Sequence, residues 1–116
     1  MSEVTIYHNG RCSKSRQTLE LLRENGVEPE IVEYLTATPT ADTLRTVLRK
    51  LALKPAGIIR RNEKVLAEEN ITIDDLDDDA LIDLMVKHPI LIERPIVVKG
   101  AAARIGRPPE QVLEIL

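Results

Sequence analysis

The fold is decided by residues 4–34, which read VTIYHNGRCSKSRQTLELLRENGVEPEIVEY. The β-branched and aromatic run at residues 4–7 predicts a strand. The helical spacing of the apolar residues that follow predicts a helix from Ser13. Gly26 would end this helix, because glycine tolerates the left-handed capping conformation. Residues 30–34 predict a second strand. The segment therefore forms a strand–helix–strand unit, whose crossover is parallel and right-handed by default.

The middle of the chain has a helical pattern. Thr40 is typical of an N-cap, and the apolar residues after it repeat with the spacing of an amphipathic helix: Leu44, Val47, Leu48 and Leu51. A short helix is expected at residues 62–69. Asp77 or Asp78 would cap a further helix, which Pro89 would end.

The C-terminal part returns to a sheet-forming pattern. Strands are expected at residues 96–98 and 103–105, with a turn at Gly100 between them. Pro108 opens a last helix, since proline is favoured in a first helical turn.

The order of these elements predicts the fold class. Two sheet-forming ends that flank a helical insert fit one α/β domain over residues 1–116, with a mixed four-stranded sheet. The core of this domain would comprise residues 3–36 and 88–116, and the helical insert residues 38–87.

The composition excludes several classes of protein. The chain has 116 residues, a net charge of −3 and two aromatic residues. Nucleic-acid binders usually carry a basic face or stacking aromatics, so we expect no nucleic-acid partner. A single cysteine cannot form an intramolecular disulfide, and the apolar runs are too short to span a bilayer. We therefore expect no membrane association and a cytoplasmic location, where a lone thiol stays reduced.

Cys12 lies between the first predicted turn and the first predicted helix. The unpaired N–H groups and the positive dipole end of a helix N-terminus favour the thiolate, which is the nucleophilic form of cysteine. Nearby cations add to this effect: Arg11, Lys14 and Arg16. The alternative is a small buried hydrophobic cysteine, which fits these polar and basic neighbours less well. Cys12 is therefore the candidate nucleophile.

Two side chains near Cys12 are candidates for tuning it. Ser15 follows one helical turn later, where its hydroxyl could donate to the sulfur, and His8 stands on the strand side. Each also has a purely structural interpretation. The pattern Cys-x-x-Ser lacks the second thiol that would resolve a mixed disulfide internally. An adduct on Cys12 would thus need an outside thiol, such as glutathione or a glutaredoxin-like protein. One cysteine and two histidines do not indicate a metal site.

Three arginines are candidates for holding an anion. The planar guanidinium group matches oxyanions in geometry and charge. The three lie far apart in sequence, so only the fold could bring them together: Arg60, Arg94 and Arg107. Taken one at a time, each is more typical of a solvated surface arginine.

Over essentially its full length, the chain resembles the glutaredoxin-coupled arsenate reductase (ArsC) family, with Spx-type regulators as distant relatives. The matching segments are residues 5–9 with Cys12, Ser15 and Arg16, then residues 60–62, 88–98, 107–110 and 112–116. The resemblance implies a thioredoxin-like (glutaredoxin-like) fold. In that fold the proline that begins the third strand is cis and faces the active cysteine, and this proline falls on Pro95.

The resemblance also implies a reaction. Cys12 would attack arsenate, and the oxyanion and its covalent adduct would be held by Arg60, Arg94 and Arg107, with His8 and Ser15 in support. Glutathione, as co-substrate, would attack the adduct, and glutaredoxin would supply the second electron. Arsenite would then leave, with no bound cofactor and no metal.

Two other functions stay open. A Spx-like regulatory protein would contact a partner protein through the same scaffold, but its Cys-x-x-Cys switch is missing here, and binding alone does not require three arginines. A thiol oxidoreductase acting on glutathionylated proteins would use Cys12 without needing every one of the arginines.

Overall fold

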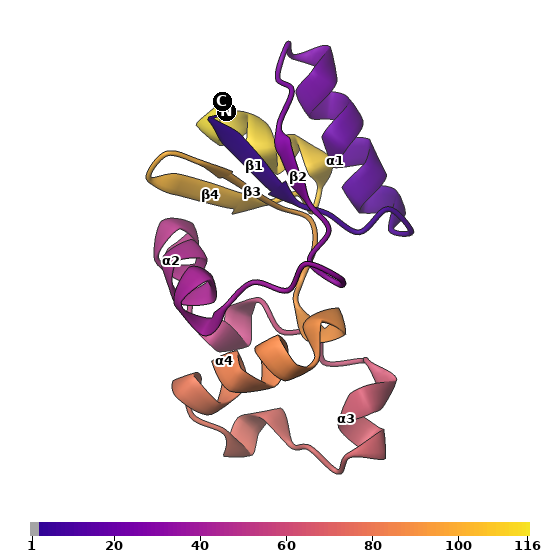
Figure 1. Ribbon diagram of the computed structural model, residues 1–116, viewed down its shortest axis with the longest axis vertical. Coiled ribbons are helices and arrows are strands. Elements are labelled where there is room, and N and C mark those ends of the chain that lie inside the picture. The colour runs from indigo at the N-terminus through magenta and orange to yellow at the C-terminus, as the bar shows by residue number, and fades with distance from the viewer. Residues whose placement is uncertain (1–2) are drawn as a thin grey trace. The chain divides into compact units, whose positions relative to one another are not determined.

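The computed structural model describes residues 3–116, and the chain divides into two compact units (Figure 1). The first unit joins the two ends of the chain, Met1–Ala37 and Arg94–Leu116. The second unit is the middle segment, Thr38–Glu93. In the described part of the chain, no helix has both the length and the apolar character that a membrane crossing requires.

A mixed four-stranded sheet forms the centre of the first unit. Its strands are β1 (Val4–Tyr7), β2 (Glu30–Val32), β3 (Ile96–Lys99) and β4 (Ala102–Ile105), in the order β2-β1-β3-β4. Strands β1 and β2 are parallel, and the other two pairs are antiparallel. The predicted strand–helix–strand start and the predicted mixed sheet are confirmed.

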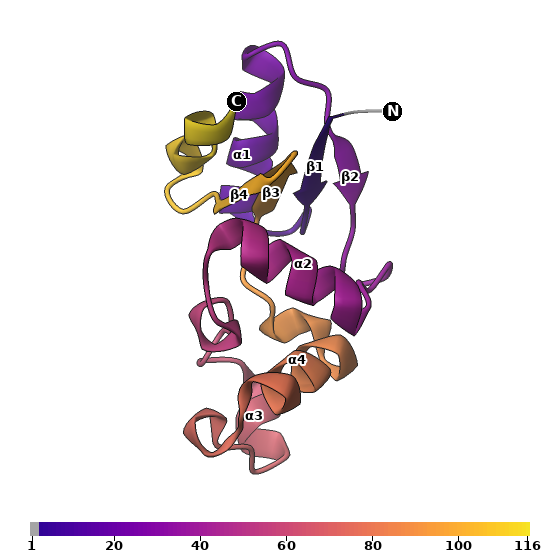
Figure 2. The ribbon, with the colours of Figure 1, turned by 90° about the vertical axis from the view of Figure 1, so that its left-hand side faces the viewer.

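One face of this sheet carries the core of the first unit. Helix α1 (Ser13–Glu24) and the 3₁₀ helix η4 (Pro109–Ile115) lie on the same face, as Figure 2 shows. Their buried side chains meet those of the strands in one cluster: Val4, Ile6, Leu22, Val97 and Val112. The last helix, expected from Pro108 onwards, is thus of the 3₁₀ type. This packing fixes α1, and with it the cysteine at its start, against the central strands.

The second unit is built from helices. Its elements are α2 (Ala41–Leu51), η1 (Pro55–Gly57), α3 (Lys64–Glu68), η2 (Ile73–Asp75), α4 (Asp78–Lys87) and η3 (Pro89–Leu91). Helix α4 lies against α2, η1 and η3. Two predicted N-caps are confirmed. The side-chain oxygen of Thr40 accepts the amide of Thr43 at 3.1 Å, and that of Asp77 accepts the amide of Ala80 at 2.8 Å.

Residues 88–93, which the sequence pattern groups with the sheet-forming end, belong to the second unit. A short antiparallel bridge between Ile59 and Ile92 holds them there. The amide of Arg60 donates to the carbonyl of Leu91 at 2.7 Å, and the amide of Glu93 donates to the carbonyl of Ile58 at 2.7 Å. Backbone pairing of this kind leaves no apolar periodicity in the sequence.

Truncating Leu22 should weaken the first unit more than truncating a surface leucine. Leu22 is 0% exposed in the sheet-facing core, so Leu22→Ala leaves a cavity and should lower the free energy of unfolding by about 2–5 kcal/mol. Leu113 in η4 is 40% exposed, so Leu113→Ala serves as the matched control and should lose clearly less. Urea unfolding followed by circular dichroism measures both. Equal losses would contradict this account of the core.

Candidate active site

Cys12 is the N-cap residue of α1, as expected from the sequence. Its amide donates to the carbonyl of Asn9 at 3.0 Å, and its carbonyl accepts the amide of Arg16 at 3.0 Å, which closes the first helical turn. The Cys12 side chain makes no capping hydrogen bond to the helix. The partly buried sulfur therefore stays available at the positive end of the helix dipole.

The loop before Cys12 is shaped by Asn9. The Asn9 Oδ1 accepts the amide of Arg11 at 3.0 Å, and the Asn9 amide donates to Ser15 Oγ at 3.0 Å. Arg16 Nη1 reaches back to the carbonyl of Gly10 at 2.9 Å. Asn9 was not among the predicted site residues. An asparagine before a glycine does carry a signal for this role, because its side chain often binds the amide two residues on.

Ser15 and His8 bond to each other inside the protein. Ser15 Oγ lies 2.7 Å from His8 Nδ1, and both side chains are buried. The expectation that Ser15 donates to the sulfur of Cys12 is therefore wrong. The hydroxyl oxygen accepts the amide of Asn9, and the hydroxyl also pairs with the His8 ring. Ser15 acts on the site by fixing the loop that carries Cys12.

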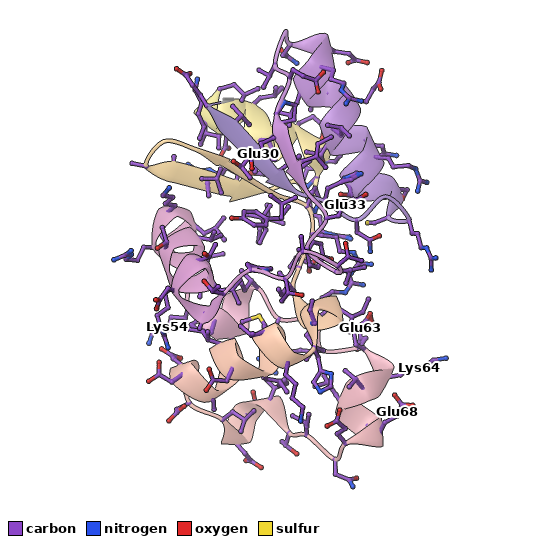
Figure 3. All side chains as sticks on the ribbon, viewed as in Figure 1. Glu30, Glu33, Lys54, Glu63, Lys64 and Glu68 are labelled. Atoms are coloured by element: carbon purple, nitrogen blue, oxygen red, sulfur yellow. The ribbon has the colours of Figure 1, made fainter. Side chains whose placement is uncertain are left out.

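Burial of the ring lowers the pKa of His8 below the ordinary value of 6.5. Glu33, labelled in Figure 3 just beyond β2, opposes this shift, while Arg16 and Arg23 add to it. His8 is therefore neutral at physiological pH. In the neutral tautomer that leaves Nδ1 unprotonated, this nitrogen accepts the Ser15 hydroxyl while the hydroxyl oxygen accepts the Asn9 amide.

Arg107 contacts the sulfur of Cys12 across 95 residues of sequence. Its Nη2 donates to Cys12 Sγ at 3.4 Å, and its Nε donates to the carbonyl of Arg94 at 2.7 Å. The Arg94–Pro95 peptide bond is cis, as the resemblance implies, and so is the bond between Arg107 and Pro108. The structure thus brings two of the three candidate arginines into the unit that holds the cysteine, and one of them onto its sulfur.

Arg60, the third candidate, belongs to the second unit and pairs there with two carboxylates. Its Nη1 lies 3.3 Å from Glu93 Oε1, and its Nε lies 3.8 Å from Oε1 of Glu63, which precedes α3 and is labelled in Figure 3. All three side chains are about three-quarters buried. Neither glutamate was predicted from the sequence. The pairing of Glu93 depends on the backbone bridge described above, whereas Glu63 lies only three residues after Arg60. The neighbouring Arg61 is half exposed and pairs with Asp74 at 3.1 Å.

The chemistry this arrangement supports is nucleophilic attack by sulfur. A thiolate at a helix N-terminus with a guanidinium in contact favours an anionic electrophile, because the cation offsets the charge of both partners. Within residues 3–116, no group of three His, Cys, Asp or Glu side chains is placed to hold a metal ion.

The buried His8 should make the protein sensitive to mild acid. Because the pKa of His8 is lower in the folded state, the unfolded chain binds protons at His8 more readily than the folded chain does as the pH falls. The free energy of unfolding should therefore fall as the pH drops below about 6.5. Urea unfolding at pH 7.5 and 5.5 measures the loss, which should be smaller in His8→Gln because glutamine does not titrate. An equal loss in both proteins would contradict the assignment.

Comparison with known proteins gives a consistent result. A family model described as "ArsC family" matches residues 7–115. A protein of Escherichia coli K12 named uncharacterized protein YfgD is 55% identical, over 98% of this chain and 97% of its own. An arsenate reductase of the same organism is 46% identical, over 100% of this chain and 82% of its own. The solved structure of an arsenate reductase from Vibrio cholerae superposes with a TM-score of 0.92 at 48% identity, covering 97% of each chain. The fold is thioredoxin-like, and the chain belongs to the ArsC family.

Proposed function

We propose that this protein is an arsenate reductase that works through a covalent adduct on Cys12, with glutathione and glutaredoxin as electron donors. The observation that carries the proposal is the 3.4 Å contact between Arg107 Nη2 and Cys12 Sγ at the start of α1. It pairs a nucleophile with an oxyanion-binding group. The names of the similar proteins supply the substrate: several of them are arsenate reductases.

In the proposed reaction, the Cys12 thiolate attacks the arsenic of arsenate, and one oxygen leaves as water after protonation. The resulting sulfur–arsenic bond is the adduct. Two outside thiols then supply two electrons. Glutathione attacks the arsenic of the adduct and displaces a second oxygen as water. A glutaredoxin thiol then takes the glutathione sulfur in a disulfide, which leaves the arsenic on Cys12 reduced from arsenic(V) to arsenic(III). Overall, one arsenic acid and two thiols give one arsenous acid, one disulfide and one water. In the last step, water cleaves the sulfur–arsenic bond, which releases arsenous acid and regenerates the Cys12 thiol.

The arginines are needed because thiolate and arsenate repel each other. Arsenate is a dianion at neutral pH, so an approaching thiolate brings like charges together. Cations that are already in place lower this barrier without having to reorganise during the reaction. Arg107 contacts the sulfur of Cys12. The proposal assigns Arg94 and Arg60 to the same oxyanion.

The lone cysteine explains why outside thiols enter the proposal. With no second thiol in the 116 residues, the chain cannot release its own adduct by forming an internal disulfide. The proposal therefore places the protein in the cytoplasm, where glutathione is abundant and a single thiol stays reduced.

The direct test is arsenate-dependent turnover by the purified protein. Arsenate, glutathione, glutaredoxin and a glutathione reductase system are supplied, and NADPH consumption is followed. Turnover should require arsenate and should vanish in Cys12→Ser, because the serine hydroxyl is a far weaker nucleophile than a thiolate. No arsenate-dependent turnover by the wild-type protein would remove the proposal. Deglutathionylation of a test protein without arsenate would instead favour the thiol oxidoreductase.

Two pairs of arginines separate the oxyanion site from general charge effects. Arg107→Ala and Arg60→Ala should each lower kcat/KM for arsenate by about 10²–10³, the typical loss on removing one oxyanion donor. Their controls are Arg104→Ala and Arg61→Ala, since these side chains pair with exposed carboxylates and should keep kcat/KM near wild type. Steady-state kinetics measures all four. Equal effects within either pair would contradict the assigned role of that arginine.

A further inference from the structure

Gly106 is a buried residue between the end of β4 and Arg107. Its amide donates to the carbonyl of Pro95 at 2.9 Å. The next residue repeats this connection through its side chain, since Arg107 Nε donates to the carbonyl of Arg94 at 2.7 Å. Two consecutive residues after β4 are thus tied to two consecutive residues before β3.

A side chain at position 106 has no room. A Cβ atom built there would lie 2.5 Å from Thr18 Oγ1, 2.8 Å from Pro95 Cγ and 3.1 Å from Thr18 Cγ2. Carbon atoms in comfortable contact lie about 3.5–4.0 Å apart, so the segment around Gly106 would have to move by roughly 1 Å. The absence of a side chain lets the backbone pass directly over α1 and the loop at Pro95.

The atoms in the way cannot yield easily. Thr18 is 0% exposed, and its hydroxyl donates to the carbonyl of Lys14 at 2.8 Å, one turn earlier in α1. Pro95 is buried, and its side chain is a closed ring. The positive-φ glycines of the described residues are Gly26 and Gly100, so backbone conformation is not what demands glycine at 106. Close approach is.

We propose that Gly106 is a positioning residue, which sets the distance between the Arg107 guanidinium and the Cys12 sulfur by seating the end of β4 on Thr18. Thr18 and Cys12 belong to the same turn-to-helix element, six residues apart. The contact between Gly106 and Thr18 therefore places Arg107 relative to the sulfur. Displacing the seat by roughly 1 Å would open the 3.4 Å contact, and misplacements of that size can cost about 10²-fold in rate.

The test is the rate at which iodoacetamide alkylates Cys12 at pH 7, in the intact protein. Arg107→Ala removes the guanidinium and should alkylate more slowly than the wild type. Its rate is the reference for a protein in which the contact is lost. Gly106→Ala should alkylate at a rate close to that of Arg107→Ala and should lower kcat/KM for arsenate about 10²-fold. A folded Gly106→Ala protein that alkylates at the wild-type rate would overturn the inference.

Gly100→Ala is the matched control within the same β3–β4 hairpin. Gly100 has a φ of +58° and open space around its Cβ position, so alanine there strains the turn without touching the site. Gly100→Ala should lose stability in urea unfolding and keep the wild-type alkylation rate. If Gly100→Ala also alkylates more slowly than the wild type, slower alkylation of Cys12 follows from lost stability in general. That result would also overturn the inference.

Thr18→Ala provides the rescue. It removes two of the three atoms that a Cβ at position 106 would strike, so the double variant Gly106→Ala/Thr18→Ala should alkylate faster than Gly106→Ala alone. If Gly106→Ala does not fold, the double variant carries the test against Arg107→Ala. If the double variant alkylates no faster than Gly106→Ala, the inference is overturned. Where Gly106→Ala does not fold, a double variant that alkylates no faster than Arg107→Ala overturns it.

The inference rests on the proposed role of Arg107, yet the alkylation rate, which decides it, is measured without arsenate. Failure of wild-type arsenate turnover would remove the proposed function and leave the alkylation comparison intact. An unchanged alkylation rate in Gly106→Ala would remove the positioning role and leave arsenate turnover untouched.

Discussion

The register of the sheet determines where the reactive sulfur meets its cation. Tyr7 at the end of β1 pairs with Ile96 at the start of β3, and Ile96 pairs in turn with Ile105 at the end of β4. These three residues form one row across the sheet. The loop to Cys12, the Arg94–Pro95 segment and the Gly106–Arg107 segment therefore emerge from the same edge. A slip of one residue in either pair would move these segments apart and turn every side chain of the slipped strand to the opposite face.

The electrostatic design of the first unit follows from that row. The dipole of α1 and the Arg107 guanidinium both act on the sulfur of Cys12, one through backbone N–H groups and the other through a side chain. His8 adds no positive charge, because burial lowers its pKa and keeps its ring neutral. Its hydrogen bond with Ser15 stabilises the loop before Cys12. The guanidinium in contact with the sulfur thus comes from Arg107, near the C-terminus, and the loop residues fix the position of Cys12.

Periodicity and capping residues predict most of the fold, because they are local properties. The first helix, the N-caps at Thr40 and Asp77 and the mixed sheet all follow from neighbours in sequence. The partner of Ser15 and the requirement for Gly106 do not. The first depends on the path of the loop between His8 and Ser15, and the second on how closely a distant segment approaches Thr18. Cys12 could be found from its setting alone. The arginines needed the family resemblance, because a solvated arginine and an oxyanion-binding arginine look the same in one sequence.

One boundary between the two units falls between Glu93 and Arg94, and these two residues bind different arginines. Glu93 pairs with Arg60 in the second unit, and the carbonyl of Arg94 accepts Arg107 in the first. Exposed ion pairs contribute little to stability, but the pair of Arg60 with Glu93 is about three-quarters buried, where charges must be matched. A single peptide bond thus links the residue that orients Arg60 to the residue that orients Arg107.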